Sequence, residues 1–255
     1  MMESADLQPA PPKAALLVIG NEILSGKVRD ENISYLAAQL FQMGWEFREV
    51  SIVGDLQTDI VSSLSRLLEK SDYVFTSGGV GPTHDDITLE SIAKALGKRL
   101  VLSPVLERLL KKFYDSEILT PAQQRLALVV EGSTLHYGED SVYPQMVIER
   151  VYPLPGIPDL FRKKFQELKS LWPVLPSPSR RCFKMVAMET ELASSLTALA
   201  EEHIQVSLGS YPTERDGTWH LELVLESRCQ DSLEMACRAL RGVLQNRDIS
   251  YREES

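Results

Sequence analysis

The sequence predicts an α/β protein in which a mostly parallel sheet has helices on both faces, followed by a small α+β domain. The first observation is that apolar runs alternate three times with helical patterns between residues 14 and 88, which favours a parallel sheet covered by helices. The second is a segment over 172–179 with three prolines and two serines, typical of a stiff linker between domains. After this segment the order of predicted elements changes to β-α-β-β-α.

The elements of the first part follow from its apolar runs and turn residues. Gly20 ends the first run and Gly44 ends the first helical pattern, since glycine is a frequent stop signal. The runs predict strands over 14–19, 47–53 and 73–76, with helices over 32–43 and 55–70. Parallel strands direct their carboxyl ends to one edge of a sheet, where ligands bind. We therefore expect the loops after these strands to form the site.

Two further helices are indicated by Ser103-Pro104 and Thr120-Pro121, because a Ser or Thr N-cap with Pro at the first helical position is a common start. Residues 142–154 are β-rich, and a Pro/Gly turn over 153–159 leads into a predicted helix over 159–171. Taken alone, this turn is equally well explained as an ordinary strand-to-helix connection.

Four segments are expected along the chain: a disordered lead-in over 1–13, an α/β domain over 14–172, a linker over 173–179 and a small α+β domain over 180–252. The last has predicted strands over 183–188, 204–208 and 219–225 and helices over 189–202 and 231–244. Its two adjacent strands predict an antiparallel hairpin. We interpret Gly209-Ser210-Tyr211-Pro212 as the approach to the hairpin turn, with a place in a ligand site as the alternative.

Composition and charge exclude several classes of function. The 255 residues are 44% hydrophobic and 25% charged, and the formal net charge of −9 argues against binding to nucleic acid or to anionic membranes. No apolar run approaches the roughly 18 residues of a membrane span, and the lead-in lacks the apolar segment of a signal peptide. Cys182, Cys229 and Cys237 are too scattered for a disulfide framework or a zinc motif. We expect a cytoplasmic protein with a small-molecule partner.

The most informative motif is the glycine-rich stretch TSGGVGPTHDDIT over 76–88. Glycines let backbone N–H groups approach an anion, and a helix opening at the carboxylates adds the positive end of its dipole. Asp85 and Asp86 would repel a phosphate there unless a cation lies between them, which predicts Mg²⁺ or a similar divalent ion. The chain has no Walker A pattern, GxGxxG or nucleophile-elbow signature, so kinase, dehydrogenase and acyl-transfer functions are disfavoured.

Similar residues follow the other predicted strands: Gly20-Asn21-Glu22, Gly54-Asp55 and Pro155-Gly156-Ile157. The candidate catalytic residues are Asp86, Asp55 and Glu22, and the candidate metal ligands are Asp86 and Asp55. The ligand-binding candidates are Gly20, Asn21, Ser77, Gly78, Gly79, Gly81, Pro82, Thr83, His84, Asp85, Thr88, Pro155, Gly156 and Ile157. Each acid also has a purely structural interpretation as a helix cap or first-turn charge. Their recurrence at strand exits favours a site.

Four ordered motifs carry a resemblance to a known family. They are VIGNEILSG over 18–26, Gly54-Asp55, SGGVGPTHDDIT over 77–88 and LPGIP over 154–158. Together they resemble the MoaB/Mog molybdopterin-binding fold, in particular the CinA type (competence/damage-inducible protein A) and the N-terminal domain of eukaryotic FAD synthase. Leu135-His136-Tyr137-Gly138 and the Gly209 to Pro212 segment are similar to the same subgroup, so the resemblance covers about residues 14–244.

The resemblance implies a pterin- or nucleotide-binding domain and, in this subgroup, divalent-metal-dependent cleavage of the diphosphate in ADP-ribose or FAD. The implied cofactor is Mg²⁺, Mn²⁺ or Co²⁺, with K⁺ as a further candidate, and the implied assembly is a homodimer. The alternatives are a non-catalytic molybdopterin-binding protein and a regulatory dimer with a degenerate site.

Two departures from the family pattern affect this expectation. The sequence ends after the second domain, so we expect neither the amidohydrolase activity of full-length CinA-type proteins nor FAD synthesis. Asn21 stands where many relatives of the resembled family carry Asp, which weakens the metal shell that the resemblance implies.

Overall fold

The structure is a computed structural model that describes residues 10–138 and 141–254. The chain divides into two compact units, with the boundary between Leu175 and Pro176. Of the lead-in predicted over 1–13, residues 1–9 lie outside the described residues, and Lys13 already belongs to the first strand. Residues 173–178 contain no helix or strand.

A parallel sheet of four strands forms the centre of the larger unit. Its strands, in the spatial order β2-β1-β3-β8, are β2 (Glu46–Val53), β1 (Lys13–Ile19), β3 (Tyr73–Ser77) and β8 (Val151–Leu154). All three pairings are parallel. This arrangement confirms the predicted α/β class and places four strand exits along one edge of the sheet.

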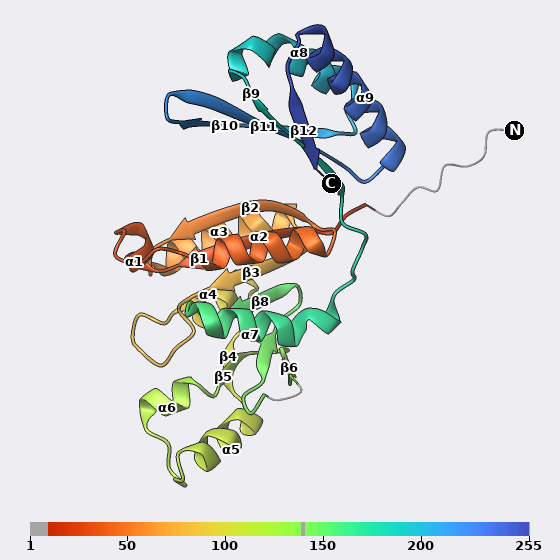
Figure 1. The fold of residues 1–255 in the computed structure, drawn as a ribbon. Helices are drawn as coiled ribbons and strands as arrows, with labels where there is room; N and C mark the ends of the chain where they lie inside the picture. The colour runs from red at the N-terminus through yellow and green to blue at the C-terminus, as the bar shows by residue number, and fades with distance from the viewer. Residues whose placement is uncertain (1–9, 139–140, 255) are drawn as a thin grey trace, which may run out of the picture. The chain divides into compact units, whose positions relative to one another are not determined.

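Helices cover both faces of this sheet, as β1 shows by its burial. Ala15, Leu17 and Ile19 pack into one core, whereas the alternate residues Ala14, Leu16 and Val18 pack into another. The first core includes residues of α3 (Gln57–Lys70) and α4 (Thr88–Ala95), and the second includes residues of α2 (Asn32–Gln42) and α7 (Pro158–Leu168). Figure 1 shows α2 and α7 side by side, where the Tyr35 and Phe161 rings pack edge to face.

A lobe beyond β3 and β8 contains elements that the sequence predicted only in part. The helices α5 (Pro104–Phe113) and α6 (Pro121–Arg125) begin where predicted, with Ser103 and Thr120 as side-chain caps. The lobe also has two short antiparallel pairs, β4 (Leu100–Leu102) with β5 (Leu128–Val130) and β6 (Thr134–His136) with β7 (Gln145–Val147). Figure 1 shows α5 and α6 at the lower end of this unit.

Two boundaries near the strand exits differ from the prediction. A short helix α1 (Asn21–Leu24) follows β1, and α4 begins at Thr88 with Ile87 as its N-cap. The prediction that a helix opens at Asp85 and Asp86 is therefore wrong. The Thr88 N–H donates to the Gly79 carbonyl oxygen (3.0 Å), which closes the preceding residues into a separate turn.

The smaller unit is an antiparallel sheet in the order β10-β11-β9-β12 with two helices. Its elements are β9 (Ser179–Val186), α8 (Glu189–Glu202), β10 (Ser207–Arg215), β11 (Thr218–Ser227), α9 (Gln230–Asn246) and β12 (Tyr251–Glu254). The antiparallel hairpin of β10 and β11 is confirmed. Gly209 to Pro212 lead toward the hairpin turn, as interpreted, but they lie within the strand: the strand predicted over 204–208 is too short, because β10 continues through Pro212 to Arg215. A proline is tolerated on such an edge strand.

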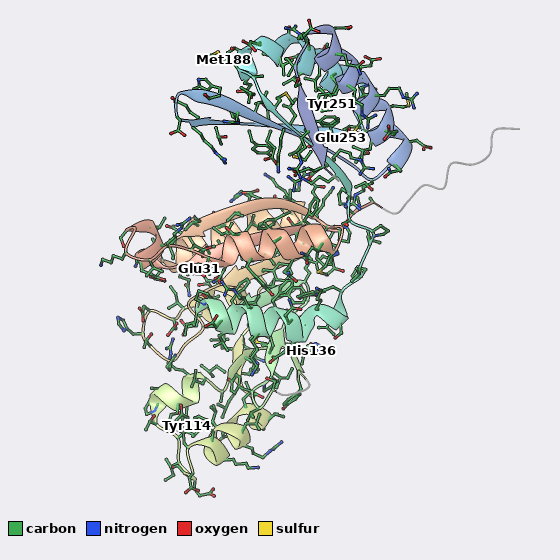
Figure 2. All side chains as sticks on the ribbon, in the orientation of Figure 1. Glu31, Tyr114, His136, Met188, Tyr251 and Glu253 are labelled. Atoms are coloured by element: carbon green, nitrogen blue, oxygen red, sulfur yellow. The ribbon has the colours of Figure 1, made fainter. Side chains whose placement is uncertain are left out.

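The last strand of the smaller unit is held by a ring contact to β9 and an ion pair to α9. Figure 2 labels Tyr251 and Glu253 on β12. The Tyr251 ring packs against Phe183 at 5.5 Å between centroids. The Arg241 guanidinium of α9 donates to both carboxylate oxygens of Glu253, at 3.0 and 2.8 Å.

The cysteines of the chain, Cys182, Cys229 and Cys237, are all free. Among the described residues, no helix has the length and apolar character needed to cross a bilayer.

We expect Leu64→Ala in α3 to lower the free energy of unfolding by about 2–5 kcal/mol, because it removes a fully buried side chain from the sheet-facing core and leaves a cavity. Leu56→Ala, just before the same helix, is the matched control because Leu56 is 56% exposed. Chemical unfolding followed by the fluorescence of Trp45 and Trp172, both in the larger unit, measures the difference. Equal effects of the two substitutions would contradict the assigned core.

Candidate functional site

The four strand exits of the parallel sheet lie in a row and are joined by short contacts. At one end, the Asn21 N–H donates to a carboxylate oxygen of Asp55 (3.0 Å), which links the exits of β1 and β2. The Gly20 N–H donates to the Val53 carbonyl oxygen (3.1 Å) across the same pair. The predicted convergence of these loops at one edge is thus present between β1 and β2.

At the other end, glycine allows three strand exits to approach one another. A Cβ at Gly78 would lie 2.2 Å from the Ile19 carbonyl oxygen, and one at Gly156 would lie 3.3 Å from the Gly78 Cα. Gly78 also has φ +100°, a conformation that side chains with a Cβ rarely adopt. Packing of the backbone therefore accounts for both glycines before any ligand is considered.

A buried asparagine fastens two of these exits and was not predicted as a site residue. The Asn32 amide, 2% exposed, donates to the Ser77 hydroxyl (2.9 Å) and to the Gly156 carbonyl oxygen (2.8 Å). Asn32 is the first residue of α2, whose N-cap is Glu31, and the Asp30 carboxylate accepts from the Ile33 N–H (2.7 Å). The Asn32 amide is thus not occupied in capping the helix. Its partners lie 45 and 124 residues away, which no local pattern indicates.

Two of the predicted ligand-binding hydroxyls are buried and have protein partners. Ser77 accepts from Asn32, and the Thr88 hydroxyl donates to the Gly78 carbonyl oxygen (2.9 Å). Both side chains hold the glycine loop in place in this structure. Of the remaining candidates, Pro155 is half-buried, and Gly156 and Ile157 are exposed at the exit of β8.

The turn over residues 81–87 concentrates carboxylates around one threonine. The Thr83 hydroxyl lies 2.6 Å from an Asp85 oxygen and 2.5 Å from an Asp86 oxygen, and the Thr83 N–H also donates to Asp86 (2.8 Å). The hydrogen bond from Thr83 lowers the pKa of Asp85. A hydroxyl has a single proton, so it satisfies one of the two carboxylates at a time. Pro82 and His84 are exposed on this turn.

The loop that precedes this turn has the opposite imbalance, namely hydrogen-bond donors without acceptors. Within the described residues, the backbone N–H groups of Gly79, Val80 and Gly81 donate to no protein acceptor. All three residues line a cavity of about 100 Å³ together with Asp86. Successive unpaired N–H groups form a concave site for anions. The cavity lining thus combines residues with free amide donors and two carboxylates, Asp86 and Glu90.

The structural interpretations of two predicted acids are excluded. Asp55 does not cap α3, whose N-cap is Leu56, and Asp86 is not a first-turn charge, since α4 begins at Thr88. Glu22 is exposed on α1, with its carboxylate folded over Gly20. Neither Asp55 nor Glu22 lines the cavity. Among the described residues, no group of three His, Cys, Asp or Glu side chains is placed to hold a metal ion.

The far wall of the cavity comes from the lobe and includes polar residues that the sequence did not indicate. Arg125 donates to the Asp86 carbonyl oxygen (2.9 Å), and Gln145 is buried beside the Pro153 carbonyl oxygen. Burial raises the pKa of Tyr143 to about 12, so its hydroxyl stays protonated and donates to the Leu126 carbonyl oxygen. Arg125 reaches Asp86 across 39 residues of sequence.

The fold and this edge define an α/β protein with a glycine-lined, acidic cavity at the carboxyl end of a parallel sheet. Residues 15–176 match the family described as a probable molybdopterin binding domain, and the chain belongs to this family. Residues 179–253 match the middle domain of FAD synthase. The resemblance drawn from the motifs is therefore confirmed.

Relatives and a solved structure are similar to this chain over most of its length or over its larger unit. A protein named probable FAD synthase from Caenorhabditis elegans is 30% identical over 270 aligned residues, which cover 95% of this chain and 52% of the relative. A CinA-like protein from Myxococcus xanthus is 28% identical, over 90% of this chain and 59% of its own length. A crystal structure of CinA from Thermoplasma acidophilum has a TM-score of 0.58 and 29% identity, over 63% of this chain and 97% of that one. The chain spans about half the length of the curated relative from C. elegans.

We expect Gly78→Ala to destabilise the larger unit more than Gly97→Ala does. Both glycines have positive φ, but a Cβ at Gly97 meets nothing within 4 Å. The left-handed conformation alone costs alanine about 1–2 kcal/mol, and displacement of the Ile19 carbonyl adds about 1–3 kcal/mol at Gly78. Equal losses in chemical unfolding would show that the strand exits have room at Gly78.

We expect Asn32→Ala to lower the free energy of unfolding by about 1–3 kcal/mol, because the Ser77 hydroxyl and the Gly156 carbonyl lose a buried donor. Gln42→Ala, at the exposed end of the same helix, should change it by less than about 0.5 kcal/mol. Hydrogen exchange of the Gly78 N–H, which donates to the Leu154 carbonyl oxygen (3.1 Å) across the same two strand exits, provides a second measurement. Unchanged exchange there in Asn32→Ala would contradict the fastening role.

Proposed function

We propose that this protein is a divalent-metal-dependent pyrophosphatase that cleaves the diphosphate of a nucleotide such as ADP-ribose or FAD. The observation that carries the proposal is the cavity in which unpaired N–H groups of Gly79, Val80 and Gly81 lie with the Asp86 carboxylate. Amide donors suit phosphate oxygens, whereas a carboxylate beside them suits a cation. A diphosphate with a bound divalent ion offers phosphate oxygens to the amides and a cation to the carboxylate.

The acids that are present fit a metal that is shared with the substrate. Mg²⁺ is commonly held by one or two carboxylates together with substrate phosphates, not by a complete protein cage. Asp86 supplies a hard oxygen donor at the cavity, and Asp55, two strand exits away, is the second candidate. When bound, Mg²⁺, Mn²⁺ or Co²⁺ would neutralise phosphate charge in the transition state. K⁺ remains a further candidate for the same oxygen-rich edge.

The protein's own groups would position and polarise the substrate. The amides of the glycine loop would hold the diphosphate against the end of β3, and Asp86 would orient the attacking water or the cation. Pro155, Gly156 and Ile157 would border the ligand on the side of β8. The relatives named FAD synthase and CinA-like support a nucleotide as the ligand.

The second candidate function is binding of molybdopterin without catalysis. The description of the matched family as a probable molybdopterin binding domain favours it. The small cavity with apolar walls such as Leu89, Leu128 and Met146 also suits a ligand that keeps only its phosphate in the glycine loop. A native mass measurement after mixing distinguishes the two functions, because the binding protein retains an intact ligand. The same measurement tests the homodimer that the resemblance implies.

We expect the wild-type protein to hydrolyse ADP-ribose or FAD only with a divalent ion, and Asp86→Asn to lower kcat by about 100-fold or more. A lost electrostatic contact in the transition state typically costs about 10²–10³ in rate. Asp59→Asn, an equal change of charge on the exposed side of α3, is the matched control. Release of AMP measured by chromatography decides the outcome. Failure of the wild type to cleave either substrate would refute the proposed activity, and full activity of Asp86→Asn would refute the role of Asp86 in it.

A further inference from the structure

One cationic side chain lines the cavity beside two acidic side chains. Among the described residues that line the cavity, Arg125 is the only cationic side chain, and Asp86 and Glu90 are the acidic ones. An anionic ligand that enters would therefore meet carboxylates first, unless Arg125 offsets them. Whether the Arg125 guanidinium is available to a ligand therefore determines whether the cavity favours an anionic or a cationic group.

The backbone of α6 holds Arg125 in place from a distant part of the sequence. The helix is a single turn with a complete capping box, in which Thr120 and Gln123 satisfy each other's backbone N–H groups. Arg125 is its last residue, and its side chain, 33% exposed, reaches the glycine turn. There one terminal nitrogen donates to the Asp86 carbonyl oxygen (2.9 Å).

The rest of the guanidinium is poorly satisfied. The same terminal nitrogen lies 3.5 Å from the Glu90 carboxylate, longer than the 2.7–2.9 Å typical of a charge-assisted hydrogen bond. The Nε atom is buried and has no partner among the described residues. A loosely paired guanidinium that is 33% exposed and lines the cavity could donate to an oxygen-rich group as a further partner. The planar fork of arginine matches phosphate geometry.

A purely structural role is the competing explanation. In that role, Arg125 would simply fasten the lobe to the glycine turn through Asp86 and Glu90. The hydrogen bond to the Asp86 carbonyl oxygen fits both explanations. The loose ion pair to Glu90 leaves the guanidinium with capacity for a further acceptor, which favours a role in binding.

We propose that Arg125 binds a phosphate of the ligand, and that Glu90 competes with that phosphate for the guanidinium. This inference rests on the proposed function, since it takes a phosphorylated nucleotide as the ligand. Arg125 would face the phosphate from the lobe, opposite the N–H groups of the glycine loop. The ligand class is therefore a phosphate ester or diphosphate, and a neutral pterin or nucleoside would gain nothing from this residue.

The test measures binding of an ADP-ribose analogue in which a methylene bridge replaces the diphosphate oxygen, so that no cleavage occurs. Calorimetric titration with Mg²⁺ present gives Kd for the wild type and four variants of the full chain. They are Arg125→Gln, Arg125→Lys, Glu90→Gln and Arg99→Gln. Arg99→Gln is the matched control, because Arg99 pairs with Glu131 on the surface and does not line the cavity. Melting temperatures without ligand show whether each variant is folded.

We expect Arg125→Gln to weaken binding tenfold or more, Arg125→Lys to weaken it less, and Arg99→Gln to leave it unchanged. Glu90→Gln should tighten binding several-fold, because it frees the guanidinium and removes a negative charge. A structural clamp predicts the opposite for Glu90→Gln, so this variant decides the matter even if Arg125→Gln does not fold. Unchanged binding by a folded Arg125→Gln, or weaker binding by Glu90→Gln, overturns the role of Arg125 and leaves the proposed function standing. Absence of binding by the wild type to this analogue, together with failure to cleave FAD, overturns both.

Discussion

In the larger unit, the edge of the sheet where the strands end depends on close backbone packing around Gly78. β3 lies between β1 and β8. At its exit, Gly78 has no room for a Cβ beside the Ile19 carbonyl oxygen, and its Cα lies 3.3 Å from where a Cβ of Gly156 would be. The Gly78 N–H donates to the Leu154 carbonyl oxygen (3.1 Å), so the sheet continues into the loop. Because these three exits are closed so tightly, the loop that follows must turn away from the sheet, and it forms the wall of the cavity.

Asn32 extends this constraint from the sheet to the helix layer. Its amide joins the side chain at the end of β3 to the backbone after β8, and it does so from the first residue of α2. Figure 2 labels the neighbouring Glu31 at this end of the helix, and Glu31 pairs with Arg162 of α7 at 2.8 Å. Both helices on this face are thereby tied to the strand exits. Movement of one exit would disturb a buried hydrogen bond in the other.

Much of the fold follows from local patterns, whereas the site depends on contacts that local patterns cannot indicate. Apolar runs and Ser-Pro or Thr-Pro caps predicted the parallel strands and the starts of α5 and α6, since period and capping are properties of neighbouring residues. The strands β4 to β7 have three residues each, too few for alternation to show. The helix predicted to open at Asp85 begins later, because Thr83 draws both carboxylates into a turn. Asn32 and Arg125 act through partners far along the chain.

The glycines of the motif separate into two groups with different physical roles. Gly78 is required by packing, because a side chain there would meet the Ile19 carbonyl oxygen, and a Cβ at Gly156 would crowd the Gly78 Cα at 3.3 Å. At Gly79 and Gly81, a Cβ would instead lie 2.3 Å from the Thr88 hydroxyl and 2.6 Å from an Asp86 oxygen. Side chains at these two positions would displace the groups that shape the cavity while leaving the sheet intact. In the proposed function, the part of the motif from Gly79 to Asp86 holds the ligand, and it is there that unpaired amides, a crowded carboxylate and the Arg125 guanidinium come together.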